Sequence, residues 1–206
     1  MKNRSPDKSN VQAKLDEMQG YLGLKMKKEA LRLAGQFLAG PRLSVEQFLK
    51  CLDVVEEFSS RSKNWRSVLD GAHGKLTRRE QEQVRSRMLR FHAAKTNNNE
   101  AVLRFLPKHI DRRTDLVDLL ITWQTWLEID RMDELEKTVP VMSDAIQTAK
   151  STEMRAWLAR VYAEFWQRKA TLVSEAEMAE LKQDYLSQFK GVSTTDSNQN
   201  RPQQQD

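Results

Sequence analysis

The chain has 206 residues, of which 39% are hydrophobic and 31% charged, and its 34 Lys and Arg exceed its 29 Asp and Glu by five charges. This length allows one ordinary domain or about five helical hairpins of roughly 34 residues each. The single cysteine, Cys51, excludes an internal disulfide framework and suits a reducing compartment. The charge excess is mild and is interpreted as spread along the chain, which favours a soluble surface over a strong requirement for nucleic acid.

Capping and turn residues predict where helices begin and end. Helix-forming residues dominate the chain, whereas Gly and Pro number only 7 and 5. Ser5-Pro6 is typical of a helix start, and Gly40-Pro41 and Gly71–Gly74 are typical of helix ends. Three segments fit the reciprocal capping box: Ser44–Gln47, Thr77–Glu80 and Ser174–Glu177. The signals predict an all-α chain of about ten helices in antiparallel pairs: 6–22, 26–39, 44–59, 63–72, 77–95, 99–109, 113–129, 131–148, 151–169 and 174–189.

Two prolines and the polar C-terminal segment limit the extent of the predicted helices. Pro107 falls inside the sixth predicted helix and Pro140 inside the eighth, and each should kink its helix or end it early because it removes a backbone donor. Residues 190–206 offer almost nothing to bury after Val192. We therefore expect 190–206 to be a disordered polar tail.

A short phrase, in which a polar turn meets the start of an apolar helix, recurs four times. The copies begin at Met26, Asn64, Asn98 and Arg131. If Leu31, Leu69, Leu103 and Leu135 are equivalent, the copies are 38, 34 and 32 residues apart. Repetition near this period is typical of stacked helical hairpins, which usually serve as binding surfaces.

The repeated units carry part of a known signature. In the first unit Tyr21 precedes Ala30 by nine residues, and in the fourth Trp126 precedes Leu135 by the same interval. These positions resemble the aromatic and small residues of the tetratricopeptide repeat family, with a leucine where the alanine is usual.

The third unit resembles the family at Leu89, Ala101 and Phe105. The second unit keeps only Trp65, Val68 and Leu69, and no unit has the glycine that the family places on its first helix.

The resemblance implies a right-handed α-solenoid over residues 1–189. Its repeats would lie near 6–40, 44–73, 77–110 and 113–148, with a capping pair at 151–189. In the family, a partner segment usually binds the concave face, which the first helix of each pair lines. The corresponding groove-facing positions here are Gln19, Arg90 and Gln124. The resemblance therefore implies a protein-interaction module or adaptor whose partner is a protein of unknown identity.

Two other features leave alternatives open. The densest basic run, 75–90, includes Arg78, Arg79 and Arg85, which can form a stripe on one helix face. A solvated face is the simpler interpretation, and the alternative function is a nucleic-acid-associated helical repeat that uses this run. The five tryptophans are interpreted as core packing, with an exposed anchor for a partner as the alternative: Trp65, Trp123, Trp126, Trp157 and Trp166.

No motif for catalysis or ligand binding occurs in the sequence. Phosphate-loop, dinucleotide, serine-hydrolase and zincin motifs are missing, and His73, His92 and His109 do not have metal-ligand spacing. Each histidine is interpreted as a helix-end or surface residue. We expect no enzyme, no cofactor and no metal. The longest apolar stretch, 116–129, is too short to span a bilayer, so we also expect no membrane partner and a cytoplasmic location.

Overall fold

The computed structural model describes residues 8–59, 62–95, 99–172 and 183, and within these residues the chain is helical without strands. The all-α prediction is confirmed for this part of the chain. Clustering of contacts divides the chain into two compact units, unit 1 (Met1–Lys108) and unit 2 (His109–Asp206). The prediction of one repeat domain over 1–189 stays a prediction.

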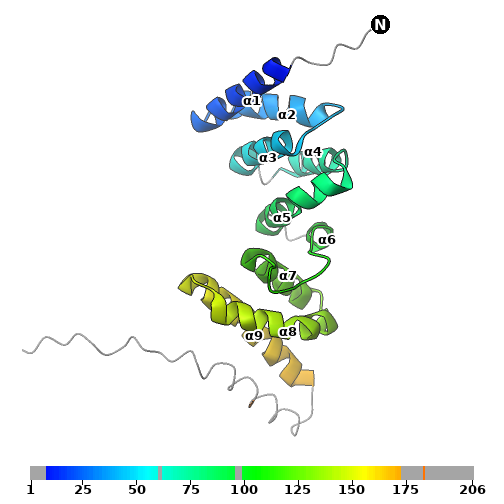
Figure 1. The fold of residues 1–206 in the computed structure, drawn as a ribbon, viewed down its shortest axis with the longest axis vertical. Helices are drawn as coiled ribbons and strands as arrows, with labels where there is room; N and C mark the ends of the chain where they lie inside the picture. Colours follow the sequence, from blue (N-terminus) through cyan, green and yellow to red (C-terminus); the bar gives the residue numbers. More distant parts are fainter. Residues whose placement is uncertain (1–7, 60–61, 96–98, 173–182, 184–206) are drawn as a thin grey trace, which may run out of the picture. The chain divides into compact units, whose positions relative to one another are not determined.

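Unit 1 contains the helices α1 (Lys8–Gly23), α2 (Lys27–Ala39), α3 (Val45–Ser59), α4 (Lys63–His73), α5 (Arg78–Lys95) and α6 (Asn99–Leu103). Its helices pack against near neighbours along the chain: α1 on α2 and α3, α2 on α3 and α4, α3 on α4 and α5, and α5 on α6. Figure 1 shows α1 and α2 as the first of these hairpins. Phe48, Cys51 and Leu52 on α3 are fully buried at the centre of the packed helices. Such packing between near neighbours is what repeated hairpins produce.

The predicted capping boxes of unit 1 are present. The amide of Ser44 donates to Gln47 Oε1 at 2.9 Å, and the Gln47 amide donates to Ser44 Oγ at 3.2 Å. The Thr77 amide donates to Glu80 Oε2 at 2.9 Å, and the Glu80 amide returns to Thr77 Oγ1 at 3.4 Å. These bonds satisfy amide groups that the first helical turn leaves without partners, so α3 and α5 begin where the sequence predicts.

Unit 2 contains α7 (Leu116–Glu128), α8 (Met132–Thr148) and α9 (Thr152–Leu172), each packed on the other two. Trp123 of α7 is fully buried, and its ring centroid lies 5.8 Å from Tyr162 and 5.4 Å from Phe165, both on α9. Helix α7 begins later than predicted because the Asp115 side chain caps it, accepting from the Val117 amide at 2.9 Å.

The two prolines behave differently. Helix α6 ends at Leu103 rather than near 109, because Pro107 has no amide to donate to the Leu103 carbonyl and disfavours a helical residue before it. Helix α8 instead continues through Pro140, which is exposed, so water can bond the carbonyl that loses its donor.

Four predictions fall wholly or almost wholly outside the described residues: the Ser5-Pro6 start, the Ser174–Glu177 capping box, the tenth helix at 174–189 and the disordered tail at 190–206.

One turn occurs in both units. Lys25 follows α1 with φ 58° and Asp130 follows α7 with φ 57°. The next amide bonds back five residues in both turns, from Met26 to the Tyr21 carbonyl at 2.9 Å and from Arg131 to the Trp126 carbonyl at 2.8 Å. This is the Schellman arrangement of a helix end.

The spacing of the two turns bears on the register of the predicted repeat. Lys25 and Asp130 are 105 residues apart, which is three times about 35. The same offset aligns Ala30 with Leu135, and both side chains are fully buried. It does not align Leu31 with Leu135 as the repeated phrase suggests, and Leu31 is only half-buried. The turn geometry therefore agrees with the nine-residue intervals and corrects the phrase alignment by one residue.

Candidate functional site

The three predicted groove residues lie in both units. Gln19 on α1 and Arg90 on α5 belong to unit 1, whereas Gln124 on α7 belongs to unit 2, and all three are half-buried. The Nε2 atom of Gln19 is buried and has no hydrogen-bond partner among the described residues. Gln124 lines a depression in the described part of the chain.

That depression lies on unit 2 and has a volume of about 510 Å³. Its walls come from two helices that the buried Trp123 cluster holds together. The lining residues are Leu120, Gln124, Ser151, Glu153, Met154 and Trp157. Ser151 places the start of α9 here, since its hydroxyl accepts from the Met154 amide at 3.2 Å. The lining therefore combines apolar side chains with a few polar groups, a composition that binding surfaces often have.

The depression contains Trp157, the exposed large apolar side chain among the described residues of unit 2. Its side chain is 44% exposed, whereas Val161 and Phe165 farther along α9 are buried. The three positions are four residues apart, but a helical turn of 3.6 residues leaves Trp157 at the flank of the buried face. The guanidinium carbon of Arg160 lies 5.9 Å from its ring centroid, a cation–π contact.

The other tryptophans fit the core-packing interpretation to different extents. Trp123 is fully buried, and Trp126 and Trp166 pack against the unit 2 core. Trp65 is half-buried, and its ring lies close to Gly35, where an added Cβ would meet it at 3.4 Å. Of the five tryptophans, only Trp157 is exposed.

The basic run 75–90 does not form one stripe. Lys75 Nζ donates to the carbonyls of Leu38 at 2.8 Å and Gly40 at 3.1 Å, at the end of α2. Arg85 donates to the Phe105 carbonyl at 3.1 Å and pairs with Glu82 at 3.0 Å. Arg78 and Arg79 are exposed in the first turn of α5. Arg85 therefore lies partly buried against the protein, whereas Arg78 and Arg79 are exposed. The three residues of the predicted stripe do not share one exposed face.

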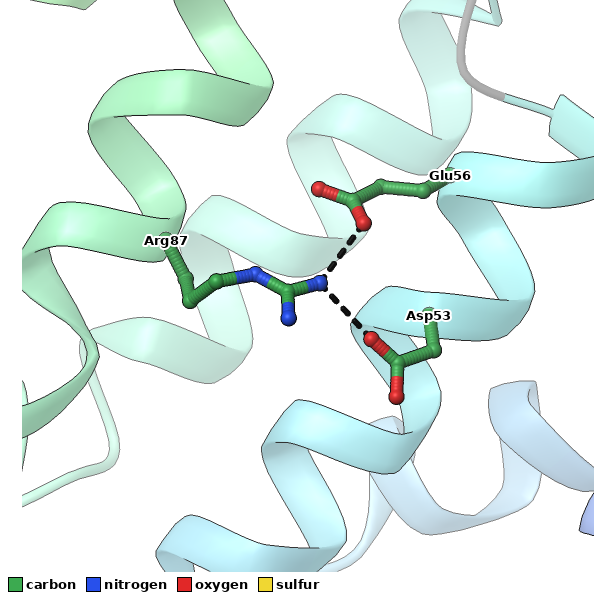
Figure 2. Close-up of polar contacts among 3 residues, drawn as sticks. All are labelled: Asp53, Glu56 and Arg87. Carbon is green, nitrogen blue, oxygen red and sulfur yellow. Dashed lines mark hydrogen bonds and ion pairs between the residues drawn. The ribbon is translucent and has the colours of Figure 1, made fainter. Parts of the chain in front are cut away.

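Arg87 of the same run ties α5 to α3. One guanidinium nitrogen lies 2.7 Å from Asp53 Oδ1 and 2.7 Å from Glu56 Oε2, as Figure 2 shows. The two carboxylates are three residues apart on α3 and so share a face. Burial alone would lower the pKa of Arg87, but the hydrogen bond to Asp53 and the charge of Glu56 outweigh it, and the pKa is raised. This cation holds two helices together, which is a structural use of its charge.

The histidines depart in part from their interpretation as surface or helix-end residues. His73 ends α4 and His109 is exposed, as expected. His92 is 1% exposed in the last turn of α5, 3.0 Å from Asp70 Oδ1, and its ring stacks on Phe105 at 5.1 Å. Burial lowers the pKa of His73. His92 is near a helix end, as expected, but it is not a surface residue, because Phe105 and Asp70 enclose it in a way that the sequence does not show.

Cys51 is a core residue, as predicted. Its side chain is fully buried, and its thiol contacts the Ala34 carbonyl at 3.7 Å. Burial, with a smaller contribution from Asp53, raises the pKa of the thiol to about 12. A thiol with this pKa is not a nucleophile at neutral pH.

Charge differs sharply between the units, which corrects the impression of an even spread. Residues 1–108 hold 22 Lys and Arg against 12 Asp and Glu, a formal net charge of +10. Residues 109–206 hold 12 against 17, a net charge of −5. The mild total of +5 conceals a basic unit and an acidic unit.

In comparisons with known proteins, no family model, no curated protein and no solved structure matches the chain. Over the described residues, no group of three or more potential metal ligands occurs. None of the described helices has both the length and the apolar character needed to cross a membrane.

Proposed function

We propose that this chain is a small right-handed helical solenoid, similar to tetratricopeptide repeats, that binds a segment of a partner protein. Two observations support the architecture. In the described part of the chain, the main helix contacts join helices one or two places apart. The same Schellman turn recurs after 105 residues, a multiple of the expected period.

The observation that carries the binding role is the depression on unit 2, where an exposed Trp157 stands beside Gln124. Exposed tryptophan is costly to leave in water and is enriched in the residues that dominate protein interfaces. The resemblance to tetratricopeptide repeats implies that Gln124 also faces the groove where a partner binds.

The geometry fits one apolar side chain of a partner. Leu120, Met154 and Trp157 supply apolar contacts from two helices. The amide of Gln124 can donate to and accept from an extended partner backbone, while Arg160, which contacts the Trp157 ring, can offer a charge-assisted bond. Because α7 and α9 are fixed by their shared core, the surface is formed before the partner arrives, which reduces the ordering cost of binding.

The test is affinity capture from the native lysate, with and without nuclease, using the wild-type chain and two variants. Trp157→Ala/Gln124→Ala alters the depression, and Leu24→Ala is the matched control because Leu24 is an apolar residue of unit 1 with 73% exposure. We expect discrete proteins that survive nuclease, remain with Leu24→Ala and fall by about tenfold or more with the double variant.

Equal recovery with both variants would contradict the assignment of the depression. Recovery that nuclease abolishes would contradict protein binding as the primary function. Circular dichroism of each variant checks that the helices are retained, which exposure of the substituted side chains leads us to expect.

A further inference from the structure

The basic unit has one end at which cations converge. Lys75, in the turn between α4 and α5, binds the carbonyls of Leu38 and Gly40 at the end of α2. This contact joins the α2–α3 turn to the α4–α5 turn, and Figure 1 shows both connections at the same side of unit 1. Arg42 lies two residues after Gly40, and Arg78 and Arg79 follow Lys75 closely.

The three arginines of this end are exposed, and within the described residues no carboxylate engages any of them. Glu46, the acidic residue nearest in sequence to Arg42, pairs with Lys50 at 3.0 Å. Glu80, the one nearest to Arg78 and Arg79, directs its carboxylate to the Thr77 amide and hydroxyl at 2.9 and 2.7 Å. These hydrogen bonds lower the pKa of Glu80, so its charge persists, but it serves the cap of α5. We name Arg42, Arg78 and Arg79 the arginine end of unit 1.

We propose that the arginine end of unit 1 binds the phosphate backbone of a nucleic acid. A guanidinium group offers paired donors that match two phosphate oxygens, and three of them lie near a turn that Lys75 fixes in place. Lys75 uses two of its three ammonium protons on carbonyls and is a positioning residue here. The net charge of +10 on residues 1–108 supplies the long-range attraction.

The surface chemistry favours phosphate over an acidic protein. Protein partners depend on an apolar or aromatic anchor at the centre of the contact. The exposed large apolar side chains of the described residues are Leu24, Met26, Val68, Leu103 and Trp157. None of them lies in the α2–α3 or α4–α5 turn, where the apolar Leu43 and Leu76 are buried. The proposal goes beyond the proposed function, and because it concerns unit 1 rather than the depression on unit 2, either can fail without the other.

The test is fluorescence anisotropy of the full chain with a labelled single-stranded oligouridylate of about 20 nucleotides, measured over a range of salt. The first variant is Arg42→Gln/Arg78→Gln/Arg79→Gln. The matched control is Lys27→Gln/Lys28→Gln/Arg32→Gln, which removes the same charge from exposed positions at the opposite end of α2.

We expect the arginine variant to bind about tenfold more weakly and the slope of log affinity against log salt to decrease in magnitude by about two, at about 0.7 per lost phosphate contact. The control should change the slope by less than about one, since it alters only the general charge of the unit.

Three results would overturn the proposal. They are the failure of the wild-type chain to bind the oligonucleotide, equal loss in both variants, and displacement of the oligonucleotide by polyglutamate at equal charge concentration. The last result would assign the arginine end to acidic peptides. Retention of the helical circular dichroism signal is required of both variants, and the surface positions of all six residues make this the expected result.

Discussion

The turn between α1 and α2 in unit 1 and the turn between α7 and α8 in unit 2 share one backbone conformation but differ in surface chemistry. Residues 24–28 carry three lysines, whereas residues 129–133 carry two aspartates and one arginine. Leu24 is 73% exposed, whereas Ile129, its counterpart 105 residues later, is half-buried. Because backbone hydrogen bonds fix both turns, the conformation does not determine the side chains. Surface chemistry and backbone geometry therefore vary independently in this chain.

The same contrast holds for the whole units. Unit 1 has a net charge of +10 and an exposed arginine end, whereas unit 2 has a net charge of −5 and an exposed tryptophan beside a depression. Both units place their apolar residues in helix contacts of the same kind. The comparison teaches that one pattern of helix packing can carry two surfaces that differ in charge and in exposed aromatic residues.

The largest expected effect tests whether the units are separate. Trp123→Ala removes the fully buried ring that contacts Tyr162 and Phe165, and it should lower the free energy of unfolding of unit 2 by about 3–5 kcal/mol. Hydrogen exchange should show faster exchange in α7, α8 and α9 with α1–α5 unchanged. An equal loss of protection in α1–α5 would contradict the division into two units.

A smaller effect is expected from breaking the ion pairs that join α5 to α3 in unit 1. Arg87→Met leaves Asp53 and Glu56 adjacent without their shared cation, and it should lower the free energy of unfolding by about 1–2 kcal/mol, discounted because all three groups are partly exposed. Urea unfolding measures this change. The control is Lys137→Met, which breaks an exposed pair with Glu134 in unit 2 and should cost less than about 0.5 kcal/mol. Equal effects would mean that Arg87 does not link the two helices.

The smallest effect sharpens the comparison of the turns. Lys25 and Asp130 have positive φ, where a residue with a Cβ is strained and glycine is not. Lys25→Gly and Asp130→Gly should each raise the free energy of unfolding by about 0.5–1 kcal/mol, measured by urea unfolding. Lys25→Gly also removes an exposed ion pair with Glu57, so its gain should be slightly smaller. Opposite signs for the two substitutions would show that the turns are not equivalent.

Local features of the fold were predictable from the sequence, whereas features that join distant residues were not. The caps at Ser44 and Thr77 were found because each box involves residues three positions apart. The cap at Asp115 was missed, although an aspartate directly before an apolar run is a recognised signal. The bonds of Lys75 to the end of α2 and of Arg87 to α3 span more than 30 residues, and no local pattern indicates them.

The candidate sites show the same division. Gln124 was predicted through the resemblance to tetratricopeptide repeats, and Trp157 was considered as an anchor. Their meeting in one depression depends on the packing of α7 against α9. Arg42 was not predicted as part of the basic surface because it is more than 30 residues from the run at 75–90, and the contact of Lys75 with Gly40 that joins the two turns is seen only in the structure. The charge difference between the units required knowledge of where one unit ends.

The buried thiol of Cys51 can report how often the helices around it in unit 1 open. With its side chain fully buried and its pKa raised to about 12, the thiol reacts with an alkylating reagent only when α2 and α3 separate. Because this is the single cysteine of the chain, the rate of its alkylation measures how often α2 and α3 separate around it. A ligand bound at the arginine end, where Lys75 contacts the end of α2, would stabilise the closed helices and so slow the alkylation of Cys51. This change can be measured without adding a label to the protein.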